Sequence, residues 1–517
     1  MLAMNAMKPS PTFGVVHIGS IRTSAAIVSW RTPTDVEIIE SVQKETTFGE
    51  EVLHAHRLSF ASIHALCTIL QGFRQLFADY GIETVYPIAT TVVREAENSL
   101  GILDLLRLRT GFSFHVAGLT EETYYKFFAL HQRLKRDKTI GKRPLLLLDV
   151  TSGGLAFTGW KSGRILFQRN AASGRLSILE HFTKKERSDV MFPSAMRDYL
   201  HAALSPLWPT IARAKIHTLV LTGFESRVLA HRLIPADANE PHAIAPETFR
   251  TFLEGLAPLT VKKLMRTFSL SERLASILLP TLLLYDETIR TIQIDSIRVM
   301  DTPFLQAYAT YAGALLCSPH AMREQDILLL DLARSVAMRY GCNLAHDERV
   351  ETFAVRIFEA LQSIHGLSER HGMLLRMSAI LHETGKFINL RNYALHTWQT
   401  VLGSDFFGIT DAEKEIIASN CYYYAKENPD HRDTHYQLLT REQKIVVDKC
   451  CAILRLADAL DQGHRDKLTI KNARLAREAL LLTYRSEDDI ALIRWTFDRA
   501  SVLFREIFGI TPILQRA

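Results

Sequence analysis

The chain has 517 residues, of which 47% are hydrophobic and 23% are charged. These are ordinary values for a globular protein, so a disordered, collagen-like or coiled-coil chain is excluded. At about 150 residues per domain, the length predicts three or four domains. Basic residues number 61 and acidic residues 56, so the net charge is +5. That charge is compatible with a polyanionic partner but does not require one.

We expect a cytoplasmic protein without a membrane-spanning segment. The most apolar run, residues 274–285, is about a dozen residues long and contains Pro280, whereas a bilayer span needs about 20 residues. The N-terminal segment lacks the apolar stretch of a signal peptide. Six cysteines without CxxC spacing predict buried thiols. The basic excess is well below that of a nucleic-acid-binding tail, so we expect no nucleic-acid partner.

The first 230 residues contain two similar α/β patterns. Each opens with an apolar run, a glycine-containing turn and a second β-rich run, and a further buried strand follows. These elements are expected at residues 13–30, 85–93 and 95–110 (a helix), and again at 144–160 and 218–223. The repetition suggests a duplicated unit. Between the two copies, the basic segment 132–143 is expected to be an exposed linker.

From about residue 305 the strand pattern gives way to amphipathic helices. They are expected at residues 327–338, 348–364, 371–382, 412–426 and 443–462. Two short β-like pieces follow, at residues 467–470 and 480–484. This part of the chain is therefore expected to be a mostly α-helical domain.

Two turns in the α/β half have the chemistry of a phosphate site. Gly19 and Ser20 lie between two expected strands, where backbone N–H groups can approach an anion closely. Arg94 follows another buried strand and offers a bidentate phosphate donor.

Acidic residues accompany these turns. Glu121 and Glu122 open a helical stretch. Asp149 ends a buried strand just before Gly153 and Gly154, a position that suits a carboxylate holding a metal ion beside a phosphate loop.

In this order, the motifs resemble those of the exopolyphosphatase and guanosine pentaphosphate phosphohydrolase family. The most specific match is REAEN, residues 94–98. The other matches are HIGSIR (17–22), the glutamate pair (121–122), DVTSGGLA (149–156) and LTG (221–223). The resemblance implies an α/β fold with two actin-like (ribonuclease H-like) lobes, expected at residues 12–140 and 141–315.

The resemblance also implies roles for these residues. Glu122 is expected to be the catalytic base that orients the attacking water, and Asp149 is expected to hold Mg²⁺. The expected phosphate-binding residues are Gly19, Ser20, Arg94, Gly153 and Gly154. The implied reaction is Mg²⁺-dependent release of terminal phosphate from inorganic polyphosphate or guanosine pentaphosphate in the cleft between the lobes. Analogy with the family implies a homodimer.

Five positions depart from the family pattern, and one of them is Phe224, which stands where the third glycine turn is expected to have a second glycine. His17 and Ala156 stand where the family has carboxylates, and Thr151 and Ser152 replace loop glycines. Imidazole is a poor ligand for a hard cation, and added Cβ atoms hinder the approach of the backbone to phosphate. These departures support an alternative, a catalytically degenerate family member that binds polyphosphate or a nucleotide in a regulatory role.

The helical domain, expected at residues 320–517, carries a second candidate site. His346, the pair His382 and Glu383, and Asp458 resemble the H…HD…D signature of HD-type phosphohydrolases, with glutamate in place of the first aspartate. The resemblance implies a second divalent metal ion in this domain. One interpretation is then that hydrolysis takes place at these residues of the helical domain. The alternative is a structural or ligand-binding domain. The remaining histidines of interest are expected to be surface or loop residues, and these are His365, His371 and His464.

Overall fold

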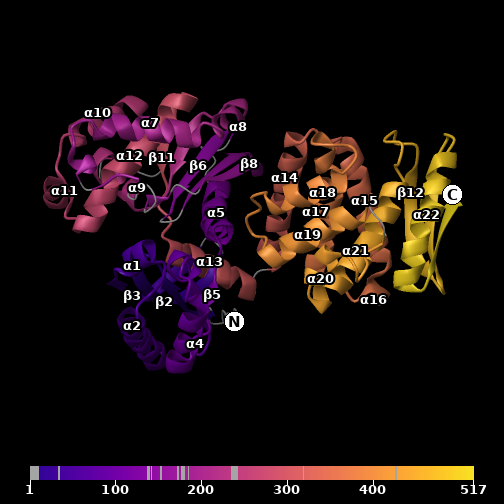
Figure 1. Cartoon of the computed structure of the whole chain (residues 1–517), viewed down its shortest axis with the longest axis horizontal. Helices are drawn as coiled ribbons and strands as arrows, with labels where there is room; N and C mark the ends of the chain where they lie inside the picture. Colours follow the sequence, from indigo (N-terminus) through magenta and orange to yellow (C-terminus); the bar gives the residue numbers. More distant parts are fainter. Residues whose placement is uncertain are drawn as a thin grey trace, which may run out of the picture. The chain divides into compact units, whose positions relative to one another are not determined.

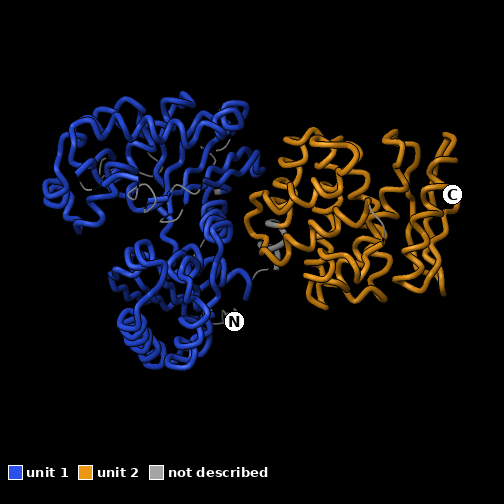
Figure 2. The backbone as a smooth tube through the Cα atoms, viewed as in Figure 1, with its two compact units in different colours: residues 1–325 blue, residues 326–517 orange. Residues whose placement is uncertain are grey.

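The chain divides into two compact units, Met1–Gln325 and Asp326–Ala517 (Figure 2). The first unit contains two β-sheets flanked by helices, and the second is mostly helical (Figure 1). The computed structural model describes residues 11–32, 35–136, 140, 142–151, 154–171, 174–175, 181–183, 185–234, 243–317, 319–425 and 428–517.

The first sheet has five strands in the order β3-β2-β1-β4-β5. β1, β2 and β3 are antiparallel neighbours, whereas β4 runs parallel to β1 and β5 runs parallel to β4. Apolar residues of the sheet form one core with those of α2 (Phe60–Asp79) and α4 (Ser99–Thr110). The strands are β1 (Thr12–Ile18), β2 (Arg22–Thr32), β3 (Asp35–Glu45), β4 (Val85–Ala89) and β5 (His115–Val116).

The second sheet has six strands in the order β10-β11-β9-β6-β7-β8. Its apolar residues form a core with α7 (Phe192–Leu204) and with the long, largely buried helix α12 (Glu272–Ile292). The strands are β6 (Leu145–Val150), β7 (Leu155–Lys161), β8 (Arg164–Ala171), β9 (Thr218–Leu221), β10 (Ala243–Ile244) and β11 (Ser296–Val299).

The two sheets repeat one topology. Without the short β10, the second sheet reads β8-β7-β6-β9-β11, the counterpart of β3-β2-β1-β4-β5. In both, three antiparallel strands are followed by two strands parallel to the first. The duplicated α/β unit expected from the sequence is therefore confirmed.

Two helices join the sheets. α5 (Leu119–Arg136) leads from the first sheet to β6, and α13 (Phe304–Cys317) brings the chain back from the second sheet onto α5, β1 and β2. The ring centroids of Tyr125 on α5 and Tyr311 on α13 lie 4.7 Å apart. A Cβ atom on Gly313 would lie only 2.0 Å from the Trp30 ring, so α13 approaches β2 as closely as glycine allows.

One helix boundary differs from the sequence expectation. The strand ends at Ala89, a short helix α3 (Thr91–Arg94) follows, and the expected helix 95–110 begins only at Ser99. The reason lies at Asn98. Its side-chain amide donates to the Leu58 carbonyl at 2.9 Å and accepts from the Leu58 N–H at 3.2 Å.

The expected exposed linker 132–143 is only partly correct. Residues 132–136 form the last turn of α5, where Leu134 is buried, and Ile140 is buried too. Apolar residues within the basic segment thus continue the helix and anchor its end. Residues 137–139 and 141 lie outside the described part of the chain.

In the second unit the five expected helices are present with shifted ends. The helices are α14 (Pro319–Arg339), which begins in the first unit, α15 (Leu344–Ala360), α16 (Gln362–His365), α17 (Glu369–Leu381), α18 (Tyr393–Leu402), α19 (Asp411–Tyr423), α20 (Thr434–Leu438), α21 (Arg441–Ala459) and α22 (Ala491–Phe508). A three-stranded sheet of β12 (Thr469–Ala476), β13 (Ala479–Arg485) and β14 (Thr511–Arg516) completes it. β14 was not predicted, because its exposed Ile513 breaks the alternating apolar pattern.

No single helix among the described residues is long and apolar enough to cross a membrane. The pair α11 (Val261–Phe268) and α12 qualifies together by length and composition only, with a bend of 101° between its members. All six cysteines are free, and four are buried as expected, whereas Cys317 is exposed and Cys342 is partly buried.

Candidate functional site

A cleft of about 370 Å³ in the first unit is lined by residues from both sheets. It lies where parallel strands end, as is usual for ligand sites of α/β folds. Gly19 follows β1, Thr90 follows β4, Thr151 follows β6 and Asp301 lies just after β11. The side chains of Glu122 and Lys126, one turn apart on α5, also face the cleft.

Glu122 is buried in the cleft wall and paired with Arg94. Arg94 donates from one nitrogen to Glu122 Oε1 at 2.6 Å and to the Ala117 carbonyl at 2.7 Å. Its other nitrogens donate to Glu95 and Thr91. Burial raises the pKa of Glu122, and the charge of Arg94 opposes that rise. Arg94 thus positions Glu122 behind the cleft surface, and is not the free phosphate donor that the sequence predicted.

Asp149, the expected magnesium ligand, is paired with a lysine. Lys126 Nζ lies 2.9 Å from both oxygens of Asp149, and the Thr222 hydroxyl donates to Oδ1 at 2.7 Å. Lys126 reaches Asp149 from α5, one turn after Glu122. The sequence interpretation missed Lys126, although a lysine in the aromatic stretch TYYKFF one turn after Glu122 was a usable signal.

Of the predicted loop residues, Gly19 and Ser20 line the cleft. The Ser20 hydroxyl is buried and has no hydrogen-bond partner among the described residues. The Gly19 N–H donates to the Arg22 carbonyl at 3.0 Å, and the Gly154 N–H donates to the Thr151 hydroxyl at 3.0 Å. These two amides therefore do not offer the free donors that were expected. Gly153 lies outside the described residues, as does Ser152.

His17 stands at the start of this loop as a neutral side chain. It is partly hidden under Phe304, with ring centroids 4.4 Å apart, and its Nε2 lies 3.2 Å from the Thr90 hydroxyl. Burial, together with the charges of Lys126 and Arg22, lowers the pKa of His17 to about 3. A neutral imidazole cannot replace the carboxylate that this position has in the family pattern.

Basic residues that the sequence interpretation did not single out line the rest of the cleft. Arg175 forms a bidentate pair with the buried Glu225, at 2.6 and 2.7 Å. Arg227 lies 3.1 Å from Asp301. Arg22 donates to Gln43 but forms no salt bridge among the described residues, and burial and the charge of Arg227 lower its pKa. The cleft therefore carries more positive than negative charge.

The side chains around Asp149 do not fit Mg²⁺. This ion prefers several oxygen ligands and keeps part of its water shell. Both Asp149 oxygens already bind an ammonium group, and the neighbouring positions that are acidic in the family are His17 and Ala156 here. The carboxylate of Glu122 is engaged by Arg94.

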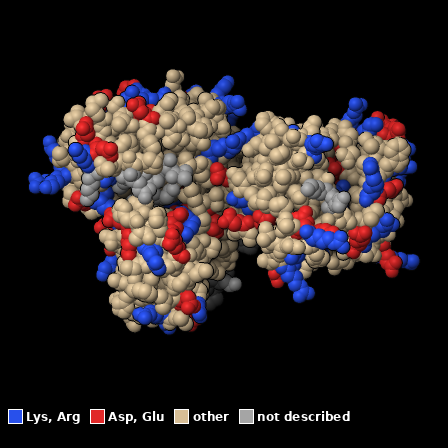
Figure 3. Space-filling model, in the orientation of Figure 1, with Lys and Arg blue, Asp and Glu red and all other residues tan. Residues whose placement is uncertain are grey.

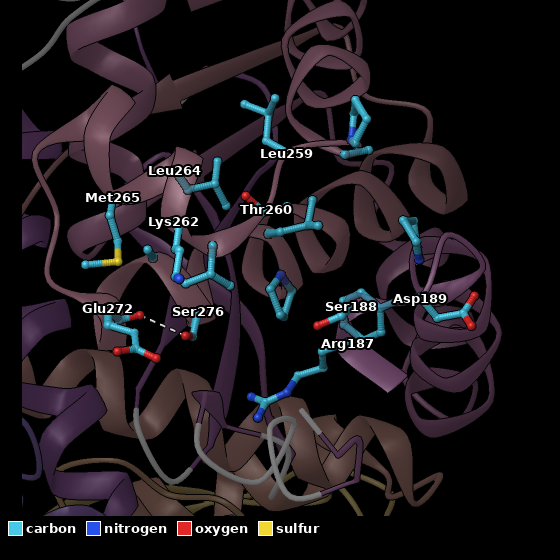
Figure 4. A pocket seen from close by; sticks show the side chains of 18 of the residues that line it. Arg187, Ser188, Asp189, Leu259, Thr260, Lys262, Leu264, Met265, Glu272 and Ser276 are labelled. Atoms are coloured by element: carbon cyan, nitrogen blue, oxygen red, sulfur yellow. Dashed lines mark hydrogen bonds between the residues drawn. The ribbon is translucent and has the colours of Figure 1, made fainter. Parts of the chain in front are cut away.

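A larger cavity, of about 990 Å³, lies elsewhere in the second lobe (Figure 4). Leu259, Leu264 and Met265 give it an apolar wall, and the Ser276 hydroxyl donates to the Glu272 carbonyl at its side. Among its lining residues there are no acid–base pairs like those of the cleft.

Both units carry basic and acidic side chains on the face of the molecule that Figure 3 shows, which is consistent with the small net charge.

The second unit brings His346, His382 and Asp458 together. His346 lies in the first turn of α15, His382 follows α17 and Asp458 lies on α21. The Nε2 atoms of the two histidines lie 3.3 and 3.5 Å from the same oxygen of Asp458. None of these three buried atoms has a hydrogen bond, because the groups are close but not aligned for one.

The opposite ring nitrogens are held by other groups. His346 Nδ1 lies 2.8 Å from Asp461, and His382 Nδ1 lies 2.7 Å from the Ala379 carbonyl. A carbonyl only accepts, so His382 Nδ1 carries a proton and its Nε2 is free to bind a metal. Glu383 joins the two histidines in a group whose ligand atoms lie within 4.8 Å of one another. Burial opposes the charged form, but Asp458 and Asp461 raise the pKa of His346 to about 9.

Three other histidines were expected to be surface or loop residues. His464 does lie in a turn, but it stacks on His346 at 3.6 Å and its Nε2 lies 3.6 Å from Glu383. The expectation is wrong for His365, which is buried and accepts from the Leu367 N–H. His371, in the first turn of α17, accepts from the Ser368 N–H in a capping box. His464 was missed as a site residue because the sequence does not show that this turn folds back over α15.

Comparison with known proteins identifies relatives of both units. Residues 27–303 match the Ppx/GppA phosphatase family, and residues 331–493 match Ppx/GppA phosphatase, domain III. The chain is similar to guanosine-5'-triphosphate,3'-diphosphate pyrophosphatases from two Aeromonas species. Identity is 35% over 88 residues with the A. hydrophila protein (17% of this chain, 18% of the relative) and 29% over 157 residues with the A. salmonicida protein (29% and 30%). These matches span less than a third of either relative.

The fold is similar to that of a solved structure, the Aquifex aeolicus member of the Ppx/GppA family. The TM-score is 0.50 at 17% identity, over 60% of this chain and all of the other. At that identity the likeness concerns the fold alone. The family match in the first unit covers more than half of the 517 residues, and on this ground the chain belongs to the Ppx/GppA phosphatase family.

Proposed function

We propose that this protein is a phosphoanhydride hydrolase that releases terminal phosphate from inorganic polyphosphate or guanosine pentaphosphate in the cleft of the first unit. The observation that carries the proposal is Glu122, a buried carboxylate held by Arg94 at the wall of a cleft with excess positive charge. Family membership and the names of the Aeromonas relatives support the substrate class.

The side chains of the cleft suit this chemistry. Phosphoryl transfer needs a positioned water and neutralisation of the charge on the phosphoryl oxygens. Glu122 accepts a hydrogen bond from the attacking water, and Arg94 fixes the orientation of its carboxylate. Arg22, Arg227 and Ser20, which line the cleft, bind oxygens of the phosphate chain. The resemblance also implies Mg²⁺ dependence, which the side chains around Asp149 do not support. The homodimer stays a prediction, and no step here depends on a metal ion or on a dimer.

The test is phosphate release from long-chain polyphosphate and from guanosine pentaphosphate, measured for wild type, Glu122→Gln and Glu121→Gln. Glu121 is the matched control, because it lies beside Glu122 but bonds His115, Tyr125 and the Gly118 N–H. We expect Glu122→Gln to lower kcat by about 10² to 10⁴, the usual contribution of a general base. Glu121→Gln should keep wild-type kcat. No release by the wild type above background rejects the hydrolase proposal.

The alternative of a regulatory binding protein has its own supporting observation. The amides of Gly19 and Gly154 are used inside their loops, and His17 replaces a carboxylate, so the site has fewer groups for turnover than the family pattern implies. Tight binding of polyphosphate without any phosphate release would establish this alternative. Hydrolysis sensitive to Glu122→Gln would reject it.

A second candidate function concerns the helical unit. The two free imidazole nitrogens converging on Asp458 favour a divalent transition metal held by His346, His382, Glu383 and Asp458. Metal content measured after dialysis tests this site directly. We expect about one equivalent in wild type and none in His382→Ala. A loss of phosphate release confined to His382→Ala, with Glu122→Gln unaffected, would move the chemistry to this unit.

A further inference from the structure

We propose that the ammonium group of Lys126 takes the place of a divalent cation at Asp149, so that the cleft binds a phosphate chain without a metal ion. This inference rests on the proposed function of the cleft for its ligand class. It is independent of the metal site suggested for the helical unit.

The first argument is the geometry of the pair. Lys126 Nζ lies 2.9 Å from each Asp149 oxygen, and Thr222 donates to one of them at 2.7 Å. The side chains of Lys126 and Asp149 are only 13% and 9% exposed. A buried, symmetric ion pair of this kind is costly to break, because removing one partner leaves the other charge buried and unpaired.

The second argument is the position of Lys126 between Asp149 and the cleft. Lys126 lines both the cleft and a separate cavity of about 20 Å³, whereas Asp149 lines the small cavity, together with Ala156 and Thr158, and is not among the residues that line the cleft. A cavity needs roughly 10–15 Å³ to hold one water. This space is too small for a magnesium ion that keeps several waters.

The third argument is that the other cleft acids are also paired. Glu122 lies 2.6 Å from Arg94, and Asp301 lies 3.1 Å from Arg227. Among the described lining residues, these two are the acids of the cleft. A metal ion would therefore have to break an existing ion pair for each carboxylate ligand that it gained.

The pair also serves the ligand expected here. The positive charge of Lys126 acts on both Glu122 and His17, which places it beside the proposed water and the first loop. A lysine is a compact point charge on a flexible stem, and it suits phosphate recognition without fixed coordination geometry. Lys126 thus supplies at this point one positive charge that needs no metal to be recruited.

The first arm of the test measures the affinity of the full-length wild-type protein for long-chain polyphosphate, by calorimetry, in EDTA and in Mg²⁺. The inference predicts Kd values that agree within about twofold after correction for magnesium bound to free polyphosphate. A Kd more than tenfold tighter in Mg²⁺ would overturn it.

The second arm counts Mn²⁺ bound to the full-length protein by electron paramagnetic resonance, without any phosphate ligand. All variants carry His382→Ala, which silences the cluster in the helical unit. In protein that retains Lys126, we expect Asp149→Asn to leave the number of bound Mn²⁺ ions unchanged. Lys126→Ala should gain one bound Mn²⁺ ion that Asp149→Asn removes. Lys126→Met, which keeps the apolar stem, should gain the same ion. Lys135→Ala, on the exposed end of the same helix, is the matched control and should gain none.

The outcomes separate this inference from the proposed function. If wild type binds no polyphosphate under either condition, the proposed function fails while the manganese arm still decides the role of Lys126. An Asp149-dependent Mn²⁺ site in protein that retains Lys126 overturns the inference. Failure of both Lys126 variants to gain the site, with both shown to be folded by circular dichroism, also overturns it.

Discussion

Arg22 is the one cleft arginine that the structure leaves without an acidic partner among the described residues. Arg94, Arg175 and Arg227 each hold a carboxylate, whereas Arg22 donates only to the neutral Gln43. An unpaired guanidinium beside other positive charges is favourable only when an anion is bound, because like charges repel at short range.

We therefore expect Arg22→Ala to weaken binding of long-chain polyphosphate about tenfold, and to lower the slope of log Kd against log salt by about one, as for loss of one phosphate contact. Calorimetry at three salt concentrations measures both quantities. Arg107→Ala, on the exposed surface of α4 next to Asp104, should change neither. An unchanged Kd for Arg22→Ala would remove this residue from the binding site.

Part of this site could be predicted from the sequence. Gly19, Ser20 and Glu122 line one cleft as predicted, because the motifs follow parallel strands whose ends meet at one edge. The hydrogen bonds of Arg94 and Gly154 were not predictable, since a motif gives a residue type but not its partners. Lys126 was missed because its partner, Asp149, belongs to a strand of the other sheet.

At the scale of elements, helix α13 decides how the first unit is built. Its tyrosines pack against Tyr125 on α5, and Gly313 lets the helix touch Trp30 on β2. The sequence predicted the strands that are continuous apolar runs, and these are β1, β2, β4, β6, β7 and β9. It missed β3, β5, β8, β10 and β11. It did not show that a helix after the second sheet would return to the first, because local periodicity carries no information about the partner of an apolar face.

Gly313→Ala should lower the free energy of unfolding by about 1–3 kcal/mol, the usual cost of forcing an extra methyl group into a packed core. The Trp30 ring that the new Cβ would meet is itself buried. Gly72→Ala in α2 is the control, since nothing lies within 4 Å of its Cβ position. It should stabilise by about 0.5–1 kcal/mol through helix propensity. Urea unfolding gives both values, and equal effects of the two changes would contradict the close contact.

At the scale of the whole molecule, each unit contains a histidine with a shifted pKa, and the two shifts have opposite directions. In the first unit the pKa of His17 is lowered to about 3. Between about pH 6.5 and pH 3, His17 therefore binds a proton in the unfolded chain but stays neutral in the folded unit. In the second unit, without metal, the pKa of His346 is raised to about 9. The folded unit then keeps a proton that the unfolded chain loses above about pH 6.5.

Calorimetry of metal-free protein should therefore show two transitions that respond differently to pH. The transition of the first unit should move to lower temperature as pH falls from about 6.5 toward 3, and His17→Gln should reduce that shift. The transition of the second unit should move to lower temperature as pH rises from about 6.5 to 9, and His346→Gln should reduce that shift. A variant whose transition keeps the full wild-type pH dependence would contradict the role of its histidine.

The return of α13 also affects the order in which the protein can fold during synthesis. The first sheet ends at Val116, yet the helix that covers β1, β2 and α5 is translated almost two hundred residues later, at Phe304–Cys317. Until then the aromatic face of α5 has no cover, and the second sheet is complete before the first has its full core. Exposed apolar surface on a partly made chain promotes aggregation. The N-terminal lobe of this phosphatase family member is thus expected to depend on chaperones while the ribosome completes the chain.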